Sequence, residues 1–344
     1  LAIEYIYLIE DAITGILAAK NRKMRKEFIM SEIKIMLGNE AIARGAFEAG
    51  VKVVSSYPGT PSTEITESVV EYKDIYVEWA PNEKVTAEVA IGASISGVRA
   101  MASMKHVGVN VASDPLYTIA YGGVNGGLVL VAADDPGLYS SQNEQDTRCV
   151  ARAAQVPVLE PSDSQEAKDF VKYAFEYSEK YDTPVIVRTT TRLSHSQGPV
   201  TLEERAEVED KVYERNVAKF VMMPGNAKNR HVYVEQRLKD MAEDGASMPI
   251  NRIEYNDKKI GFITSGIAYQ YVKEACPEAS VCKLGLVHPL PRKMIEEFAK
   301  NVETLYIFEE LEPVIEEQVK SWGIKCIGKE IFTVQGEYSA NMIR

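Results

Sequence analysis

One uninterrupted apolar run, Leu128–Ala133, limits the possible folds more than any other feature of the chain. Such a run is typical of a strand that is buried on both faces of a parallel sheet. Further strands are predicted at Val51–Val54, Arg99–Met104 and Pro184–Arg188, and helices are predicted at Asn39–Ala49, with Asn39 as cap, and at Glu83–Val98. Because strands alternate with helices, the sequence predicts an α/β domain built on a parallel sheet.

The remaining chain divides into segments of different character. We expect an N-terminal extension at residues 1–30, the α/β domain at 31–200, a charged and mostly helical linker at 201–255, and a smaller α/β domain at 256–344. Strands of the smaller domain are predicted at Lys259–Gly266, Ala279–Leu284 and Leu305–Phe308. In the extension an apolar start precedes a basic cluster at 20–26, which is the reverse of a secretory signal.

Charge and cysteine content exclude several classes of function. The net charge of −11 comes without a basic stripe, which argues against a nucleic-acid partner. Charged residues interrupt the apolar stretches, so no transmembrane span is expected. The four cysteines form no Cys-x-x-Cys pair, so no metal site is predicted, and reduced thiols favour a cytoplasmic protein.

The loop Tyr57–Ser62 is predicted to end a strand and open a helix. Thr60 precedes Pro61, a pattern that predicts Thr60 as helix N-cap and Pro61 as the first helical residue. A helix N-terminus attracts anions such as a carboxylate. The alternative is an ordinary strand-to-helix connection without a ligand.

Glu83 and His106 are two further candidate site residues. Glu83 opens a helix rich in small residues, including Gly92 and Ala93, where backbone can pack close to a ring; the alternative is a solvated glutamate stabilised by the helix dipole. His106 follows a predicted strand, where it can act as general acid or base or donate to a substrate. A purely structural role for His106 is the alternative.

A polar loop, Asp134–Asp146, follows the buried strand Leu128–Ala133. Ligands of parallel sheets bind at the carboxyl ends of strands, so this loop is a candidate for ligand contact. Asp134 and Asp135 are adjacent and should point apart, so a paired-carboxylate site is not expected. The glycine-rich run Tyr121–Gly127 lacks the dinucleotide spacing and precedes a strand, which disfavours a Rossmann-type nucleotide binder.

Together these ordered motifs resemble the alpha subunits of indolepyruvate:ferredoxin oxidoreductases, in the thiamine-diphosphate-dependent 2-oxoacid:ferredoxin oxidoreductase family. The resemblance runs from about Ile33 to the end of the chain. It is carried by Tyr57–Ser62, Glu78–Lys84, Met104–Gly108, Ser113–Pro115, Ala133–Gly137, Ser140–Asp146, Ile263–Tyr269 and Glu309–Pro313. It implies a pyrimidine-binding thiamine-diphosphate domain followed by a transketolase-C-like domain.

The resemblance also implies residue roles. Glu83 would contact N1′ of the thiamine aminopyrimidine, with Glu88 as the alternative, and Tyr57, Pro58 and Gly59 would contact the cofactor. Thr60 and His106 would join Glu83 in catalysis, and the substrate pocket would be lined by Thr60, His106, Asp134, Ser140 and Gln142. Pyruvate enzymes carry an arginine after the central strand, whereas this chain reads Ala133–Gly137 there, which favours an aryl substrate over pyruvate or another 2-oxoacid.

The implied reaction is oxidative decarboxylation of arylpyruvates to arylacetyl-CoA, with coenzyme A as acyl acceptor and ferredoxin as electron acceptor. The family's Gly-Asp-Gly motif for Mg²⁺ and diphosphate is missing from this sequence, where Glu243–Gly245 is the nearest match, as is its cysteine-rich iron–sulfur segment. We therefore expect an oligomer in which a further chain or segment supplies both, a beta subunit takes part, and this chain alone is inactive. The alternative is a non-catalytic folded fragment or scaffold subunit.

Overall fold

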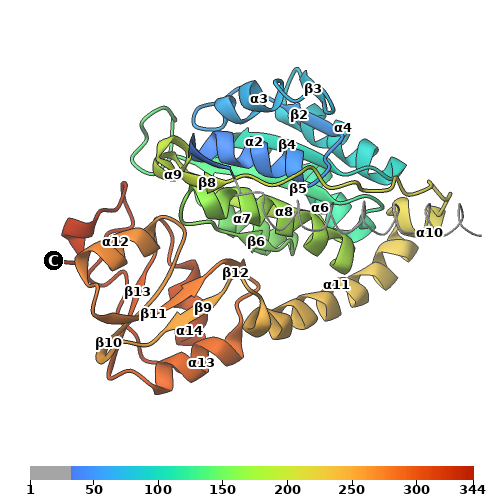
Figure 1. Cartoon of the computed structure of the whole chain (residues 1–344). Coiled ribbons are helices and arrows are strands. Elements are labelled where there is room, and N and C mark those ends of the chain that lie inside the picture. The colour runs from blue at the N-terminus through green and yellow to red at the C-terminus, as the bar shows by residue number, and fades with distance from the viewer. Residues whose placement is uncertain (1–31) are drawn as a thin grey trace, which may run out of the picture.

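The computed structural model describes residues 32–344, so the predicted extension lies outside the described residues. A seven-stranded sheet forms the larger domain in the order β12-β6-β7-β5-β4-β2-β3 (Figure 1). All neighbours are parallel except β12. The strands are β2 (Val53–Ser56), β3 (Tyr76–Trp79), β4 (Ala100–Lys105), β5 (Leu128–Asp134), β6 (Val158–Leu159), β7 (Val185–Thr190) and β12 (Leu286–His288). The predicted parallel α/β class is confirmed, and every residue of β5 is buried.

Helices cover both faces of this sheet. On one face lie α2 (Gly38–Glu48), α3 (Thr63–Val69) and α8 (Ser164–Tyr181). On the other lie α4 (Glu83–Ser96), α5 (His106–Val111), α6 (Ser113–Gly122) and α7 (Thr147–Ala154). The predicted helix from Glu83 is confirmed, and Gly97 ends it in the left-handed conformation that glycine favours (φ 113°).

The smaller domain holds a four-stranded sheet in the order β13-β10-β11-β9. Its strands are β9 (Arg252–Glu254), β10 (Asp257–Ser265), β11 (Ala279–Leu284) and β13 (Thr304–Phe308), and its helices are α12 (Ala268–Ala275), α13 (Arg292–Lys300) and α14 (Val314–Ser321). The three strands predicted here are confirmed. After β11 the chain crosses to the larger sheet, where β12 pairs antiparallel with β6.

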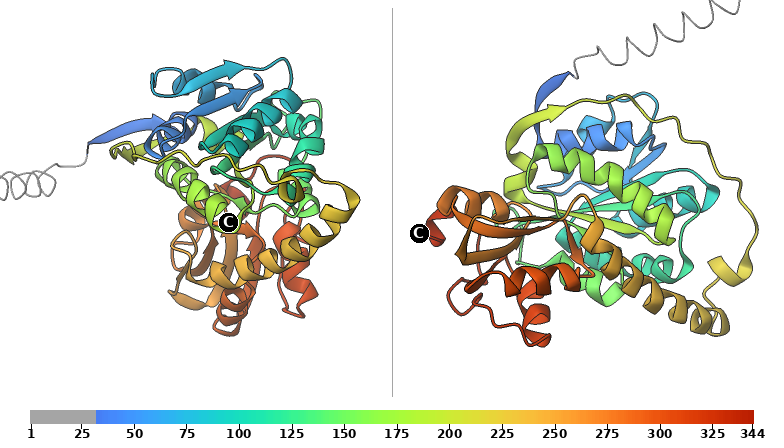
Figure 2. Two further views of the ribbon diagram at one scale, coloured as in Figure 1. Left: turned by 90° about the vertical axis from the view of Figure 1, so that its right-hand side faces the viewer. Right: turned by 60° about the horizontal axis from the view of Figure 1, so that its bottom comes forward.

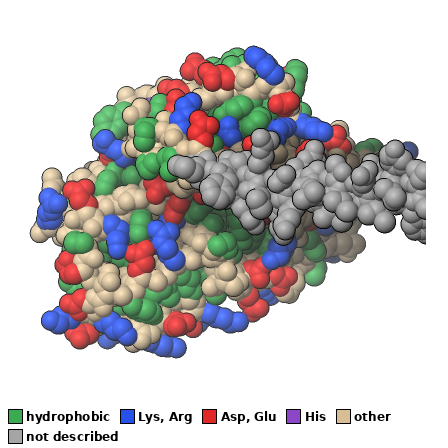
Figure 3. All heavy atoms as spheres, viewed as in Figure 1, with side chains coloured by type: hydrophobic (Ala, Val, Ile, Leu, Met, Phe, Trp, Pro, Cys, Tyr) green, Lys and Arg blue, Asp and Glu red, His purple; other side chains and the backbone are tan. Residues whose placement is uncertain are grey.

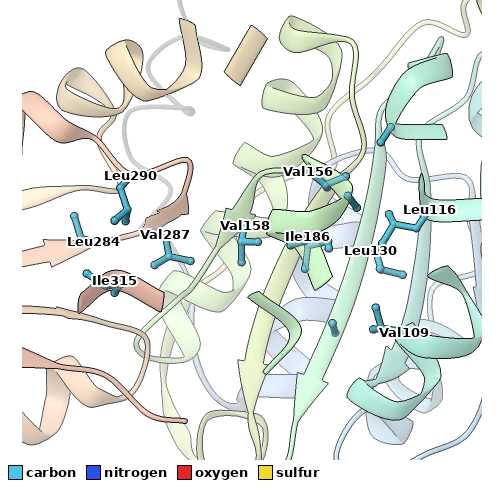
Figure 4. Close-up of a cluster of buried hydrophobic side chains, with 14 of the residues drawn as sticks. Val109, Leu116, Leu130, Val156, Val158, Ile186, Leu284, Val287, Leu290 and Ile315 are labelled. Carbon is cyan, nitrogen blue, oxygen red and sulfur yellow. The ribbon is translucent and has the colours of Figure 1, made fainter. Parts of the chain in front are cut away.

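The crossing strand β12 joins the two domains into one continuous hydrophobic core. Figure 4 shows Val287 of β12 between Val158 of β6 and Leu284 of β11. All three side chains are fully buried. Such burial stabilises by about 1.5–3 kcal/mol per aliphatic side chain. The smaller domain is therefore packed firmly against the larger sheet.

The prediction for the linker was only half right. Residues 202–216 contain neither helix nor strand, and the helices come later, at α10 (Val217–Phe220), α11 (Pro224–Asp244) and the 3₁₀ turn η1 (Gly245–Ser247). The extended part runs along the larger domain, and α11 returns to the smaller one (Figures 1 and 2). Ala206 N donates to Glu48 O and Lys211 N donates to Gly97 O. These tertiary hydrogen bonds replace the ones that a helix would provide.

Near the start of the described chain one strand was missed and one prediction was wrong. A strand, β1 (Ile33–Leu37), precedes α2 and pairs antiparallel with β8 (Gln197–Thr201), forming a separate ribbon. Asn39 does not cap α2, which begins at Gly38. The buried Asn39 amide instead donates to Pro61 O at 2.8 Å and so fixes the loop after β2.

Neither the helices nor the surface visible in Figure 3 suggests a membrane-spanning or strongly one-signed character of the described residues. No helix within residues 32–344 is long and apolar enough to cross a membrane. On the face shown in Figure 3, acidic and basic side chains are intermixed, without a large patch of one sign.

Candidate active site

The carboxyl edge of the larger sheet brings together the loops that carry most of the predicted residues. Ser56, the last residue of β2, is paired with Trp79 of β3 and Ser103 of β4, and Lys105 is paired with Ala133 of β5. The chain therefore leaves four parallel neighbouring strands at one edge, where parallel sheets bind ligands.

Glu83 is the first residue of α4 and lies at this edge. Asn82 caps the helix, its side chain accepting from Val85 N at 3.0 Å. The half-buried Glu83 side chain lies against α5: a Cβ atom built on Gly108 would stand 2.7 Å from Glu83 Oε1. Glu88, the alternative candidate, is exposed to solvent.

The close backbone approach beside Glu83 comes from Gly108 of α5 and not from Gly92 of its own helix. Gly92 lies nine residues along α4, about half a turn round the helix from Glu83. A Cβ atom at Gly92 would meet nothing within 4 Å. Gly108 belongs to the motif Met104–Gly108 but was not predicted as a site residue, because the packing of α4 on α5 cannot be predicted from either segment alone.

Thr60 is not the N-cap of the next helix, which corrects the sequence prediction. The loop makes an additional turn, in which Ser62 N and Ser62 Oγ both donate to Gly59 O at 2.8 Å. The helix α3 then begins at Thr63, with Ser62 at the N-cap position. Pro61 is consequently not a helical residue. Thr60 itself is exposed, and its carbonyl accepts from Ser140 Oγ at 3.0 Å.

The loop Asp135–Asp146, here called the β5 loop, folds over the carboxyl edge. Asp135 accepts from Ser140 N (2.8 Å), Ser141 Oγ (2.7 Å) and Thr191 Oγ1 (2.8 Å). Burial alone would raise the pKa of Asp135, but these hydrogen bonds hold that pKa below its usual range. Lys105 Nζ donates to Ser140 O at 3.0 Å. Ser140 and Gln142 are exposed at the surface of the loop.

His106 contacts the β5 loop through a hydrogen bond of its buried ring. Its side chain is buried, and Nε2 lies 3.1 Å from Asn143 O. A neutral ring that donates from Nε2 leaves Nδ1 as an acceptor. Nδ1 is buried without a hydrogen-bond partner among the described residues. The structure thus brings His106 to the predicted edge with one polar atom unused.

Asp134 does not line an open pocket, which corrects its predicted place. Its side chain is fully buried and accepts from Arg188 Nε at 2.6 Å and from Thr147 N at 3.0 Å. Asp134 and Asp135 do point apart, as expected for adjacent residues of a strand end. Burial raises the pKa of Asp134, and Arg188 opposes this rise.

Beneath the β5 loop, a buried ionic network joins the two domains. Arg148 donates to Asp146 Oδ2 (2.6 Å), to Glu309 Oε2 (2.7 Å) and to Glu310 O (2.8 Å). Glu160 accepts from Arg188 Nη1 and from Ser265 Oγ, both at 2.5 Å. Within residues 32–344, no group of three or more His, Cys, Asp or Glu side chains has the arrangement of a metal site. Because Arg148 contacts Glu309 and Glu160 contacts Ser265, the ionic network holds the two domains together.

The chain resembles known proteins both in sequence and in fold. Residues 44–259 match the family described as pyruvate flavodoxin/ferredoxin oxidoreductase, thiamine diphosphate-binding. The "Indolepyruvate oxidoreductase subunit IorA" of Pyrococcus abyssi is 48% identical over 313 residues, which are 86% of this chain and 48% of that protein. The "2-oxoglutarate synthase subunit KorA" of Methanocaldococcus jannaschii is 30% identical over 193 residues, or 52% of this chain and 51% of that one.

The fold has a counterpart among solved structures. The 2-oxoglutarate:ferredoxin oxidoreductase of Magnetococcus marinus, solved with 2-oxoglutarate, coenzyme A and succinyl-CoA bound, superposes with a TM-score of 0.77. At 18% identity, it covers 91% of this chain and 64% of its own. The chain spans about half the length of the curated IorA subunits that it matches.

Proposed function

Because the chain belongs to the thiamine-diphosphate-binding pyruvate flavodoxin/ferredoxin oxidoreductase family, we propose that it supplies the aminopyrimidine-binding part of a 2-oxoacid:ferredoxin oxidoreductase. One observation carries the proposal most directly. The carboxylate of Glu83 is held half-buried at the carboxyl edge of the sheet, against the bare backbone of Gly108. Ligands bind at this edge in parallel α/β folds.

The residues at the edge fit the aminopyrimidine half of thiamine diphosphate. Bound thiamine diphosphate supplies the electron sink for cleavage of the bond between the carboxyl and carbonyl carbons. In our proposal Glu83 hydrogen-bonds N1′ and controls the proton at that atom, and Tyr57, Pro58 and Gly59 pack beside the ring. The buried and unpartnered Nδ1 of His106 adds a polar contact beneath the same edge.

The substrate would lie between the loop after β2 and the β5 loop. There the exposed hydroxyl of Thr60 can donate to a 2-oxo group or a carboxylate, and Ser140, whose own hydroxyl donates to Thr60 O, lines the same space. Tyr57, Leu138 and Tyr139 expose apolar surface at the same edge. Apolar contacts of this kind suit an aromatic ring, so we propose arylpyruvates, indolepyruvate among them, as substrates.

The remaining parts of the reaction are assigned to partners. We propose that a chain or segment with a Gly-Asp-Gly motif holds the diphosphate and Mg²⁺, and that iron–sulfur clusters carried with it pass electrons to ferredoxin. A beta subunit and coenzyme A complete the assembly, which yields arylacetyl-CoA.

Two alternatives deserve an experiment. The similarity to proteins named 2-oxoglutarate synthase and 2-oxoglutarate:ferredoxin oxidoreductase favours a different 2-oxoacid as second candidate. A non-catalytic scaffold subunit is the other. Viologen reduction should be followed with indolepyruvate and coenzyme A, with and without the partner chain. Reduction only with the partner supports the proposal. If no 2-oxoacid reduces viologen in the complete assembly, the enzymatic proposal is wrong and the scaffold stands.

A further inference from the structure

Two carboxylates link the β5 loop to the C-terminal segment of the smaller domain, and they reach across in opposite directions. Glu144 of the loop accepts from Gly336 N at 2.9 Å, and the same Oε1 atom accepts from Gly137 N at 2.6 Å within the loop. Glu337 of the C-terminal segment accepts from the Tyr139 hydroxyl at 3.1 Å. Each side therefore supplies one acceptor to the other.

Glu337 also binds a third element. Its carboxylate forms a two-point ion pair with Arg192 of α9 (Thr191–His195), with Nε at 2.6 Å and Nη2 at 2.8 Å. The Glu337 side chain is 12% exposed and the Arg192 side chain 55%, so water reaches this pair from the arginine side. Two parallel N–H···O bonds fix the plane of the carboxylate, and Oε2, which accepts from Arg192 Nη2, also accepts from the Tyr139 hydroxyl.

The segment that carries Glu337 is itself anchored. The neighbouring Tyr338 is buried against Phe308 and Phe332, and its backbone N–H donates to Glu310 Oε1 at 3.0 Å. Lys329 Nζ donates to the Tyr338 hydroxyl at 2.8 Å. Glu337 is therefore held by the smaller domain as a rigid support.

The β5 loop needs such a support. Gly137 (φ 89°) and Leu138 (φ 60°) both have left-handed backbone, which is unusual for leucine and costs of order 1–3 kcal/mol. The same loop carries Ser140, whose hydroxyl donates to Thr60 O. Tyr139, which contacts Glu337, is therefore the direct neighbour in sequence of Ser140, which contacts Thr60 at the proposed substrate position.

We propose that Glu337 and Glu144 are positioning residues, through which the smaller domain holds the β5 loop against Thr60 and so sets substrate affinity. The consequence for affinity rests on the proposed function, whereas the restraint of the loop does not. Neither carboxylate needs to touch substrate or cofactor. Their removal should loosen the loop and weaken binding while the reacting groups stay in place.

The test uses the full chain in its complete assembly. Glu337→Ala removes the contacts with Tyr139 and Arg192, and Glu144→Ala removes the contacts with Gly137 N and Gly336 N. Glu296→Ala is the matched control, because Glu296 also pairs with an arginine, Arg292 at 2.6 Å, on the distant helix α13. Hydrogen exchange of loop amides 137–145 and steady-state KM and kcat for the 2-oxoacid are measured for each.

We expect Glu144→Ala and Glu337→Ala to speed exchange of the loop amides about 3- to 10-fold and to raise KM by a similar factor, with kcat within about twofold of wild type. The control should change neither. Unchanged exchange in both variants overturns the restraint, and faster exchange with unchanged KM overturns the link to affinity. A wild-type assembly that oxidises no 2-oxoacid defeats the proposed function, yet the exchange result still decides the restraint.

Discussion

Glu83 occupies the space that a side chain at Gly108 would take: a Cβ atom there would stand 2.6 Å from Glu83 Cγ and 2.7 Å from Oε1. The glycine on α5 thus determines where the proposed cofactor-binding carboxylate points. Because a contact under 3.0 Å cannot persist, any residue larger than glycine must push Glu83 aside.

Gly108→Ala should therefore reduce kcat/KM by about 10²-fold, since small displacements of a reacting group carry penalties of this size. Alanine is the better helix former by about 1 kcal/mol, so stability should not suffer from helix propensity. Gly92→Ala, in open surroundings on α4, is the control and should keep full activity. Equal activity of the two variants would show that the position of Glu83 does not matter.

Glu83→Gln should lower viologen reduction by about 10²–10⁴-fold in the complete assembly while leaving the melting temperature unchanged. The amide keeps the shape of the side chain but cannot exchange a proton with N1′. Glu88→Gln, on the exposed part of the same helix, is the control. An active Glu83→Gln enzyme together with an inactive Glu88→Gln enzyme would transfer the role to Glu88.

The sequence predicted most of the sheet because buried parallel strands are continuous apolar runs. Leu128–Ala133 became a strand as expected, and so did Ala279–Leu284, although Ser280 and Lys283 interrupt its apolar residues. The two-residue strand β6 and the crossing strand β12 were missed, because their pairing depends on contacts far apart in the chain. The strand β1 was missed although Ile33 and Ile35 alternate with polar residues; both isoleucines are exposed, and β1 lies outside the main sheet.

For the site, the sequence located the edge but not the contacts. Motifs that follow parallel strands must meet at one edge, so Tyr57–Ser62 and His106 could be placed together in advance, whereas the strand before Glu83, β3, was not predicted. Which side chain faces the edge depends on packing between loops. Asp134 therefore proved to be buried with Arg188, and Asn39 proved to hold Pro61. Glu337, nearly two hundred residues beyond Tyr139, carries no local signal at all.

Arg148→Met should destabilise the chain by about 3–5 kcal/mol, because it leaves buried carboxylates without their counter-charge. The carboxylates that lose their counter-charge are Asp146 and Glu309, which are both almost fully buried. Urea unfolding of the variant, with Arg292→Met on α13 as a surface control, gives the measurement. A loss below about 1 kcal/mol would mean that the interdomain network is not a major source of stability.

Glu310 should make stability depend on pH. Burial raises the pKa of Glu310 to about 7 from 4.5, although the Tyr338 N–H opposes the rise. Below pH 4.5 the residue is protonated in both folded and unfolded states and has no effect. Between pH 4.5 and 7 the unfolded chain loses the proton first, so the free energy of unfolding falls by up to about 3 kcal/mol as the pH rises. Above about pH 7 this residue causes no further change in stability.

Glu310→Gln should remove this loss, because an amide cannot ionise yet still accepts from Tyr338 N. Melting temperatures of variant and wild type should agree near pH 4.5 and should differ increasingly up to about pH 7, with the variant more stable. Glu296→Gln, at an exposed ion pair, serves as the control. A gap that stays constant over this pH range would contradict the raised pKa.

The last prediction concerns the choice of 2-oxoacid. The carboxyl edge carries the acidic residues Glu83, Asp135, Glu144 and Glu337 against the basic residues Lys105 and Arg192, of which Arg192 is paired with Glu337. The second carboxylate of 2-oxoglutarate should be repelled there. The exposed apolar surface of Tyr57, Leu138 and Tyr139 favours a ring over the methyl group of pyruvate.

An apolar contact the size of one methylene contributes about 1–3 kcal/mol to discrimination, so an aryl group should be preferred over pyruvate by at least about 100-fold. The measurement is kcat/KM of the complete assembly for indolepyruvate, phenylpyruvate, pyruvate and 2-oxoglutarate. Leu138→Ala should lower kcat/KM for the aryl substrates more than kcat/KM for pyruvate, because only the ring reaches that side chain in our proposal. If pyruvate or 2-oxoglutarate is the better substrate, the aryl assignment is wrong, while the role of Glu83 is decided separately by Glu83→Gln.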